Sequence, residues 1–337
     1  MDQDGPGRRR RRRRQHRRSG EDFISSLPDE ILRSILLRLG SVRAAASTSV
    51  LSRRWRHVWA HLPELVSVNN TGHDHDVRPL LDTVDAALAA YADPTLEALV
   101  VVLSTAYADG LGGVIVTARR VAPWLRFAAE RVAGELVVFE PPPMMPPSYV
   151  PELELPACPR AKTIALRIDT FWRLPVVKPP SGVFVFTALT SLTMFMGTMA
   201  GGEVTDLVST RCPCLRNLRL CLTIVNDHDV SIRSVSLHTM SLRLWGTRRL
   251  EVVAASLENL YLCNTIDEVC ISAPKLAEIA WCGDAYYPCR CNFDGLGRCL
   301  RLLDIDIGAG SVVASLMQRF DQVDELKLAI SIARVCC

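Results

Sequence analysis

The 337-residue sequence contains no run of eighteen or more apolar residues and only four lysines. A helix needs roughly 20 consecutive apolar residues to cross a bilayer, so the first absence argues against a membrane span. The N-terminus is rich in arginine and no apolar segment follows it, so it does not fit a secretory signal. The shortage of lysine stands beside plentiful Ala, Arg, Val and Leu, a pattern that codon bias explains.

The twelve cysteines do not show metal-binding spacing. Zinc ribbons use paired C-x₂-C motifs, and none is present. Cys221 and Cys263 stand in strand-like apolar surroundings, where cysteine behaves as a small hydrophobe. Without a secretory signal, the compartment is expected to be reducing and the thiols free. The three closest pairs are Cys212 with Cys214, Cys289 with Cys291, and Cys336 with Cys337.

Catalytic signatures are missing too. The sequence has no G-x-S-x-G, H-E-x-x-H or protein-kinase motif. The glycine-rich segment Asp109–Gly113 lacks the Lys-Ser/Thr of a phosphate-binding loop and is better explained as a turn. His73–Asp76 offers metal ligands, but such groups in a polar connector are usually solvated. We therefore expect a non-catalytic protein without a metal or cofactor.

The positive charge is concentrated in the first twenty residues. They hold nine of the 39 basic and two of the 36 acidic residues, which leaves 30 against 34 and a net charge of −4 for the rest. A block of like charges repels itself, so residues 1–20 are expected to be disordered. Such a tail serves either as a nuclear-localisation or polyanion-binding signal or as a solvated extension.

Residues 22–66 have the pattern of three short helices. The segment LPDEILRSILLRL places apolar side chains on one helical stripe from Ile31 to Leu39. Ser26 and Pro28 are typical of a helix start, and Gly40 is typical of a helix end. A second helix is expected around residues 43–48 and a third around residues 52–61. This unit buries too little to be stable alone, so it is expected to pack on a partner or on the next domain.

An L-x-x-L-x-L pattern recurs through the second half of the sequence. Eight units, 19 to 28 residues apart, are typical of leucine-rich repeats, each of which supplies one strand and depends on its neighbours for stability. Two earlier segments, from Leu96 and Ala133, fit the pattern at wider spacing, with a helix broken or kinked at Pro123 between them. The eight units begin at Ala161, Leu189, Leu215, Leu237, Leu257, Leu276, Leu300 and Val323.

The two regions together resemble plant F-box/leucine-rich-repeat proteins, including FBD-type relatives. Residues 22–66 resemble the F-box, in particular through Leu27-Pro28 and the stretch TSVLSRRWR that ends at Arg56. CPCLRNLRL and SAPKLAEIAW are similar to the family's repeats. A counterpart of the C-terminal FBD domain is not evident. The resemblance implies an α/β fold in which a three-helix F-box precedes a solenoid with a curved, mainly parallel sheet.

The resemblance also implies a function. A protein of this family would be the substrate receptor of an SCF-type ubiquitin ligase, with the F-box on a Skp1-like adaptor, a cullin and RING ligase beyond it, and an unknown target protein on the repeats. It would act in the nucleus or the cytoplasm, by proximity rather than by chemistry of its own. The residues that match the adaptor-binding surface or its supporting core are Leu27, Pro28, Ile31, Leu32, Ile35, Leu36, Val50, Leu51 and Trp55.

Residues that alternate with the buried leucines are expected to face the concave side of the solenoid. Early units offer arginines there and late units offer carboxylates, so the concave face is either graded in charge or simply carries ordinary solvated charge. A partner with the opposite gradient would fit the first alternative. The candidate substrate-binding residues are Arg167, Arg219, Arg243, Tyr261, Glu278, Asp304 and Asp306.

The expected organisation is a tail at 1–20, the F-box at 22–66, a connector at 67–95 and repeats at 96–330, irregular at 96–156 and regular at 161–330.

The main alternative to the receptor function is a nuclear protein that binds nucleic acid or another polyanion. It depends on the arginine tail and on the arginine- and tryptophan-rich stretch SVLSRRWRHVW. The mildly acidic body and the lack of nucleic-acid-binding motifs argue against it. The two tryptophans of that stretch are instead expected to be core and docking anchors.

Overall fold

The structure, a computed structural model, describes residues 27–68, 78–103, 116–139, 150–168, 172–175, 186–263, 266–282, 290–294, 300–307 and 323–330. Several segments considered above lie outside these residues. They are the arginine tail at 1–20, His73–Asp76, Asp109–Gly113 and Cys336–Cys337. No helix in the described part of the chain is long and apolar enough to cross a membrane.

The N-terminal unit consists of three short helices, as predicted. They are α1 (Asp29–Arg38), α2 (Val42–Ser47) and α3 (Arg53–Val58), with single 3₁₀ turns after α2 and α3. Pro28 immediately precedes α1, and Gly40 follows it with a φ of 63°, a left-handed conformation that favours glycine and ends the helix. Ser52 caps α3, since its hydroxyl accepts a hydrogen bond from the Trp55 backbone N–H.

The tryptophans of this unit lie in its core. Trp55 is 6% exposed and Trp59 is 8% exposed, and both pack with Leu32 and Leu36 of α1 and with Val58. A unit this small needs its largest side chains inside to have a core, so the predicted core role of the two tryptophans is confirmed. Their role as docking anchors stays a prediction.

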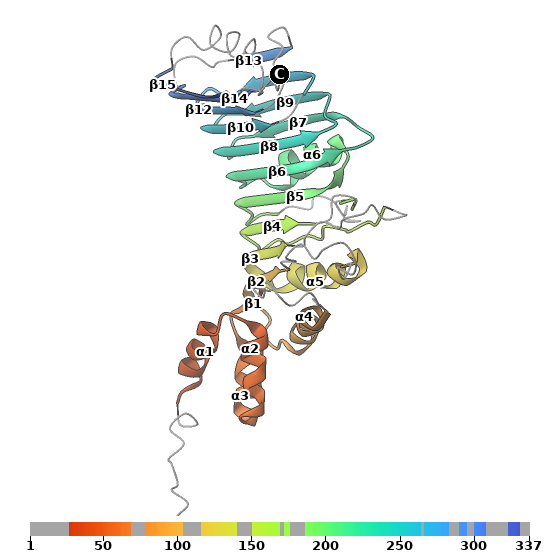
Figure 1. Cartoon of the computed structure of the whole chain (residues 1–337), viewed down its shortest axis with the longest axis vertical. Helices are drawn as coiled ribbons and strands as arrows, with labels where there is room; N and C mark the ends of the chain where they lie inside the picture. Colours follow the sequence, from red (N-terminus) through yellow and green to blue (C-terminus); the bar gives the residue numbers. More distant parts are fainter. Residues whose placement is uncertain are drawn as a thin grey trace, which may run out of the picture.

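Eleven parallel strands form one continuous sheet after the helices (Figure 1). The order follows the sequence, which is what a solenoid with one sheet strand per repeat produces. The strands are β1 (Glu64–Val68), β2 (Leu96–Val102), β3 (Val132–Phe139), β4 (Thr163–Arg167), β5 (Ser191–Met199), β6 (Asn217–Ile224), β8 (Thr239–Trp245), β10 (Asn259–Cys263), β12 (Glu278–Cys282), β14 (Leu302–Ile307) and β15 (Glu325–Ile330).

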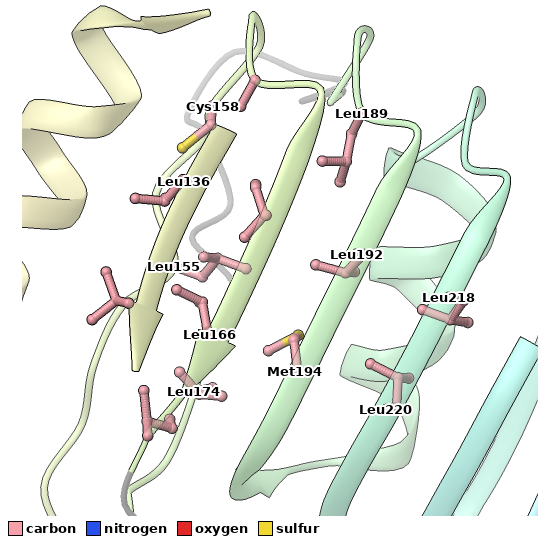
Figure 2. Close-up of a cluster of buried hydrophobic side chains, with 14 of the residues drawn as sticks. Leu136, Leu155, Cys158, Leu166, Leu174, Leu189, Leu192, Met194, Leu218 and Leu220 are labelled. Atoms are coloured by element: carbon pink, nitrogen blue, oxygen red, sulfur yellow. The ribbon is translucent and has the colours of Figure 1, made fainter. Parts of the chain in front are cut away.

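The apolar positions of the repeat pattern form the core. In the regular units from Ala161 to Leu276, all three pattern positions are buried, as the sequence predicts. Figure 2 shows how side chains from neighbouring strands gather in one cluster, for example Leu136, Leu166, Leu192 and Leu218. No single repeat encloses such a cluster, so each strand depends on its neighbours for burial.

A second sheet covers the core from the opposite side, and the sequence analysis did not predict it. It contains β7 (Asp229–Ser234), β9 (Arg249–Ala254), β11 (Glu268–Ser272) and β13 (Cys291–Asp294), all parallel. Earlier repeats place helices on the same side, namely α4 (Arg78–Ala90), α5 (Ala118–Arg131) and α6 (Gly201–Asp206) (Figure 1). The core therefore lies between the eleven-stranded sheet and this mixed outer layer.

Two details differ from the predicted organisation. Of the break or kink expected at Pro123, the break does not occur, because helix α5 continues through this residue. A proline removes one hydrogen bond of the helix, and the buried apolar face around Trp124 and Leu125 offsets that loss. The stretch 67–95, expected as a connector, contains α4 and the last residues of β1, which pairs with β2 and so extends the sheet to Glu64.

The helical unit is joined to the sheet without a gap. Helix α2 packs against α4 and β1, and the buried residues of the three helices belong to the same core as the repeats. Tyr91 reinforces this junction, because its hydroxyl lies 3.0 Å from the Leu62 carbonyl oxygen and 2.8 Å from that of Thr95. The hydroxyl can donate its proton to either carbonyl, and burial raises the pKa of Tyr91 to about 12.

Candidate functional site

The helical unit carries an exposed apolar surface. Val50 is 86% exposed and Leu51 is 66% exposed on the turn between α2 and α3, while Ile31 and Ile35 are exposed on α1. Large apolar side chains exposed at neighbouring positions, as Val50 with Leu51 and Ile31 with Ile35 are, are typical of a surface that binds another protein. We call Ile31, Ile35, Val50 and Leu51, together with the exposed Pro28, the apolar docking surface.

The predicted adaptor-binding residues thus fall into two groups. Pro28, Ile31, Ile35, Val50 and Leu51 are accessible to a partner. The other four support them from below, since Leu27 is half-buried and three are buried, namely Leu32, Leu36 and Trp55. Leu37 and Leu39 are also exposed, and they were not among the predicted adaptor-binding residues.

An ion pair fixes the two helices that carry this surface. The Arg54 guanidinium donates to Asp29 Oδ1, 2.8 Å from Nε and 2.6 Å from Nη2, and it also donates to the Leu27 carbonyl oxygen. It therefore ties the start of α1 to α3. Nothing in the sequence indicates that these two residues, 25 positions apart, meet.

The predicted concave face is the face of the eleven-stranded sheet that turns away from the core. Because neighbouring strands are parallel and in register, its residues form rows across the sheet. One row contains Thr163, Ser191, Asn217, Thr239, Asn259, Glu278, Leu302 and Glu325. The next contains Ala165, Thr193, Arg219, Ser241, Tyr261, Ala280, Asp304 and Lys327. The third contains Arg167, Phe195, Cys221, Arg243, Cys263, Cys282, Asp306 and Ala329.

Five of the seven candidate substrate-binding residues line a single hollow on this face. Its volume is about 490 Å³, within the range of ligand-binding clefts. These five residues come from successive strands of the sheet, and they are Arg219, Arg243, Tyr261, Glu278 and Asp304. Arg167 lies outside the hollow on β4, and the side chain of Asp306 is outside the described residues.

Neutral side chains hold the charged groups of the hollow in place. The Arg219 guanidinium lies 6.0 Å from the centre of the Phe195 ring, a cation–π contact. Arg243 Nη2 donates to Tyr261 Oη at 3.4 Å, and this hydrogen bond raises the pKa of Arg243. The amide Nδ2 of Asn259 donates to Glu278 Oε2 at 3.4 Å.

The charge order along the hollow follows the predicted gradient. Arginines stand on β6 and β8 and carboxylates on β12 and β14. Beyond β14 the gradient ends, because Lys327 Nζ lies 3.5 Å from Glu325 Oε1 and neutralises it. The predicted acidic end is therefore limited to Glu278 and Asp304 among the described side chains.

Three cysteines stand in the third row, where the strands approach one another. Cys263 Sγ donates to Cys282 Sγ at 3.1 Å, and Cys221 is one strand beyond Arg243. Burial raises the pKa of Cys221. The sequence did not predict that Cys263 and Cys282 meet, although aligning the two repeats on their leucines places them opposite each other. The described residues contain no group of three metal-ligating side chains.

Two protein-family models match this chain. A model of the F-box domain matches residues 24–66, and a model of the LRR repeats of FBD-associated F-box protein At5g56370 matches residues 121–286. The first ends at β1, and the second runs from α5 to β12 and the residues that follow it. The two matches thus correspond to the helical unit and to most of the solenoid.

Three curated proteins of Arabidopsis thaliana illustrate the similarity. F-box protein At5g03100 is 37% identical over 114 residues, which are 34% of this chain and 32% of that protein. F-box/FBD/LRR-repeat protein At5g56420 is 33% identical over 121 residues, 36% and 26% of the two chains. F-box/LRR-repeat protein 25 is 52% identical over 48 residues, 14% and 19%.

The chain spans less than half of the length of these relatives. No solved structure matches it.

Proposed function

Because this chain combines an F-box domain with leucine-rich repeats of the FBD-associated F-box type, we propose that it is the substrate receptor of an SCF-type ubiquitin ligase. In this proposal the F-box binds a Skp1-like adaptor, which connects the chain to a cullin and a RING subunit. The repeats hold the protein that is to be ubiquitinated. Neither matching family model describes an enzyme, in keeping with a non-catalytic role.

The observation that carries the proposal is the apolar docking surface. Val50 and Leu51 are large apolar side chains on a turn of the F-box, and leaving them in water is unfavourable by roughly 1.5–3 kcal/mol each relative to full burial. The Arg54–Asp29 ion pair and the buried Leu32, Leu36 and Trp55 hold this surface in shape before any partner arrives. A preformed surface loses little freedom on binding, which favours affinity.

The arrangement of the two parts suits a receptor. The helices stand at one end of the solenoid, and the sheet extends away from them (Figure 1). A protein held on the concave face would therefore sit at a fixed place relative to the adaptor, since helices and sheet share one core. Holding a substrate near an activated ubiquitin raises the effective concentration of the substrate's lysines. In this proposal the chain contributes nothing else to the reaction.

The test is the capture of a Skp1-like adaptor by variants of the docking surface. We expect Val50→Asp/Leu51→Asp to weaken capture of a purified Skp1-like adaptor at least tenfold, because a carboxylate would be buried without a partner at the interface. Val235→Asp is the matched control, since Val235 is 78% exposed and directly follows β7 of the outer sheet, away from the F-box. Capture should be measured by titration with the full chain, together with the melting temperature of each variant.

Two results would contradict the proposal. One is a wild-type chain that does not capture the adaptor. The other is a double variant that captures it as well as wild type does. A variant that loses capture and also melts early would be replaced by Val50→Ser/Leu51→Ser, which removes the apolar surface without adding charge.

A further inference from the structure

The two sheets of the solenoid differ in whether their charged side chains form ion pairs. On the outer sheet, arginines pair with carboxylates of neighbouring strands or turns: Arg233 with Glu251 at 2.6 Å, and Arg248 with Asp229 at 2.8 Å. Arg249 and Glu268 form a looser pair at 3.8 Å. Each of these three arginines is therefore paired within the molecule.

The hollow on the concave face has the opposite property. Among the described residues, Arg219, Arg243, Glu278 and Asp304 form no ion pair. The neutral Phe195, Tyr261 and Asn259 hold three of them, as described above. Arg219, Arg243 and Glu278 are thus oriented without an ion pair, and Asp304 has Lys327 as its cross-strand neighbour but no ion pair with it. An oppositely charged ligand group gains most at such unpaired charges.

The four charges are arranged as two pairs. Arg219 and Arg243 lie on the adjacent strands β6 and β8, and Glu278 and Asp304 lie on the adjacent strands β12 and β14. Strand β10, which carries Tyr261, separates the pairs. With strands about 4.8 Å apart, the midpoints of the pairs are separated by three strand spacings, roughly 14 Å. An extended chain advances about 3.3 Å per residue, so four or five residues cover this distance.

We propose that the hollow recognises an extended peptide segment whose acidic and basic side chains are separated by about three neutral residues. The acidic end would bind Arg219 and Arg243, the basic end would bind Glu278 and Asp304, and the middle would lie over Tyr261. This inference rests on the proposed receptor function and names the class of target segment that the receptor selects.

An extended peptide fits these observations better than a small molecule does. The outermost charges, on β6 and β14, are four strand spacings or roughly 19 Å apart, which exceeds the reach of a single amino acid or similar zwitterion. The hollow is open along the sheet, and charged groups are distributed along its length rather than gathered at one point. A chain that crosses the strands contacts both pairs at once.

The experiment uses synthetic fluorescein-labelled peptides and the full chain bound to a Skp1-like adaptor. Two probes contain two glutamates and two lysines separated by three serine or glycine residues, in either order. The comparison peptides carry the same charges without the spacer, only glutamates, or only lysines. We expect the spaced peptides, in at least one order, to bind at least tenfold more tightly than any comparison peptide, with affinity that falls as salt is added.

Variants assign the binding to the hollow. Arg219→Ala/Arg243→Ala should weaken binding of the spaced peptide at least tenfold, while Arg248→Ala on the outer sheet, the matched control, should leave it unchanged. Glu278→Lys/Asp304→Lys should lose the spaced peptide and bind the all-glutamate peptide instead. Arg219 and Arg248 are exposed, whereas Arg243, Glu278 and Asp304 are half-buried, so a melting curve of each variant is needed to show that its fold is intact.

The inference is overturned if no spaced peptide binds, if all charged peptides bind equally, or if the Glu278→Lys/Asp304→Lys variant keeps wild-type preference. If free glutamyl-lysine competes with the spaced peptide at the same concentration, the ligand of the hollow is a small zwitterion and the proposed peptide ligand is wrong. Adaptor capture by the same preparations separates the two proposals. If the chain captures the adaptor but binds no peptide, only the peptide inference is contradicted. If the chain does not capture the adaptor, the receptor function is contradicted.

Discussion

Glu251 illustrates how a single side chain can make the stability of the outer sheet depend on pH. Its carboxylate accepts hydrogen bonds from Ser231 Oγ at 2.8 Å and from Arg233 Nη2 at 2.6 Å, so β9 is tied to β7. These two partners, the serine hydroxyl first, hold the pKa of Glu251 below its usual value of 4.5. The charged form is the one that the folded state favours.

We predict that Glu251→Gln lowers the pH dependence of stability in acid. In the wild type, the depressed pKa contributes stability that is fully present above pH 4.5 and is lost as pH falls through the folded-state pKa. The glutamine variant cannot titrate, so its urea midpoint should fall less than the wild-type midpoint between pH 6.5 and pH 3.5. Equal falls in both proteins would show that Glu251 is not a source of acid sensitivity.

Sequence reasoning reached the concave residues but not their contacts. The alternation of residues about the leucines is enough to choose the outward side, and aligning the repeats gives the rows, so Arg243 opposite Cys263 and Ser241 opposite Tyr261 follow from the sequence. The diagonal hydrogen bond between Arg243 and Tyr261 depends on side-chain rotamers. Those rotamers are set by packing across strands, which no pattern in a single sequence records.

At the scale of elements, the start of α6 depends on one glycine. A Cβ atom on Gly201 would lie 2.6 Å from the Asp227 carbonyl oxygen and closer still to that of Asp229, so the turn before β7 packs directly on this backbone. The Gly201 N–H also donates to the Asp227 carbonyl oxygen at 2.7 Å. The neighbouring Gly202 is exposed and meets only the side-chain oxygen of Asp227.

We predict opposite outcomes for the two glycines. Gly201→Ala should lower the free energy of unfolding by about 2 kcal/mol, because the added methyl group displaces the backbone of residues 227–229. Gly202→Ala should change it by less than about 0.5 kcal/mol, as for other exposed substitutions. Urea unfolding of both variants measures the difference. A Gly201→Ala variant as stable as the wild type would mean that the turn moves aside freely.

The outer sheet was not predicted from the sequence because the repeats that form it are short. Repeats of 19 to 22 residues leave no room for a full helix between strands, so the chain crosses the outer side as a second short strand. The signal was present as alternation, since Val230 with Ile232 and Leu250 with Val252 are buried. Strands of five or six residues between strong L-x-x-L-x-L motifs are easily taken for loops.

On the scale of the whole molecule, the F-box and the repeats behave as one body because their cores are continuous. Sequence reasoning expected the helices to need support from a partner or from the next domain, and the next domain supplies it through α4 and β1. It could not predict that the supporting strand begins at Glu64, since a strand of five residues beside a helix gives a weak pattern. Tyr91 is the polar link in this apolar junction.

We predict that Tyr91→Phe loosens the F-box without affecting the distant repeats. The lost hydroxyl removes the one proton shared between the Leu62 and Thr95 carbonyl oxygens, and the buried Leu62 carbonyl is left without this donor, which costs about 1–3 kcal/mol. Hydrogen exchange should quicken in α2 and α3 and stay unchanged in β8–β12. Tyr261→Phe on the concave face is the control and should leave exchange in α2 and α3 as in wild type. Uniformly faster exchange along the whole chain would contradict a local junction.

The in-register stacking of the sheet has a consequence for how proteins with this architecture diversify. Each repeat adds one strand, so its insertion or deletion shifts the charges on either side by one fixed step of about 4.8 Å. If the hollow binds the proposed peptide, duplicating the repeat that carries Tyr261 lengthens the spacing it selects between acidic and basic groups by one or two residues and leaves the F-box unchanged. The distance between the two charged pairs therefore changes only in whole strand spacings. Gain or loss of a repeat changes that distance without altering the residues of either pair.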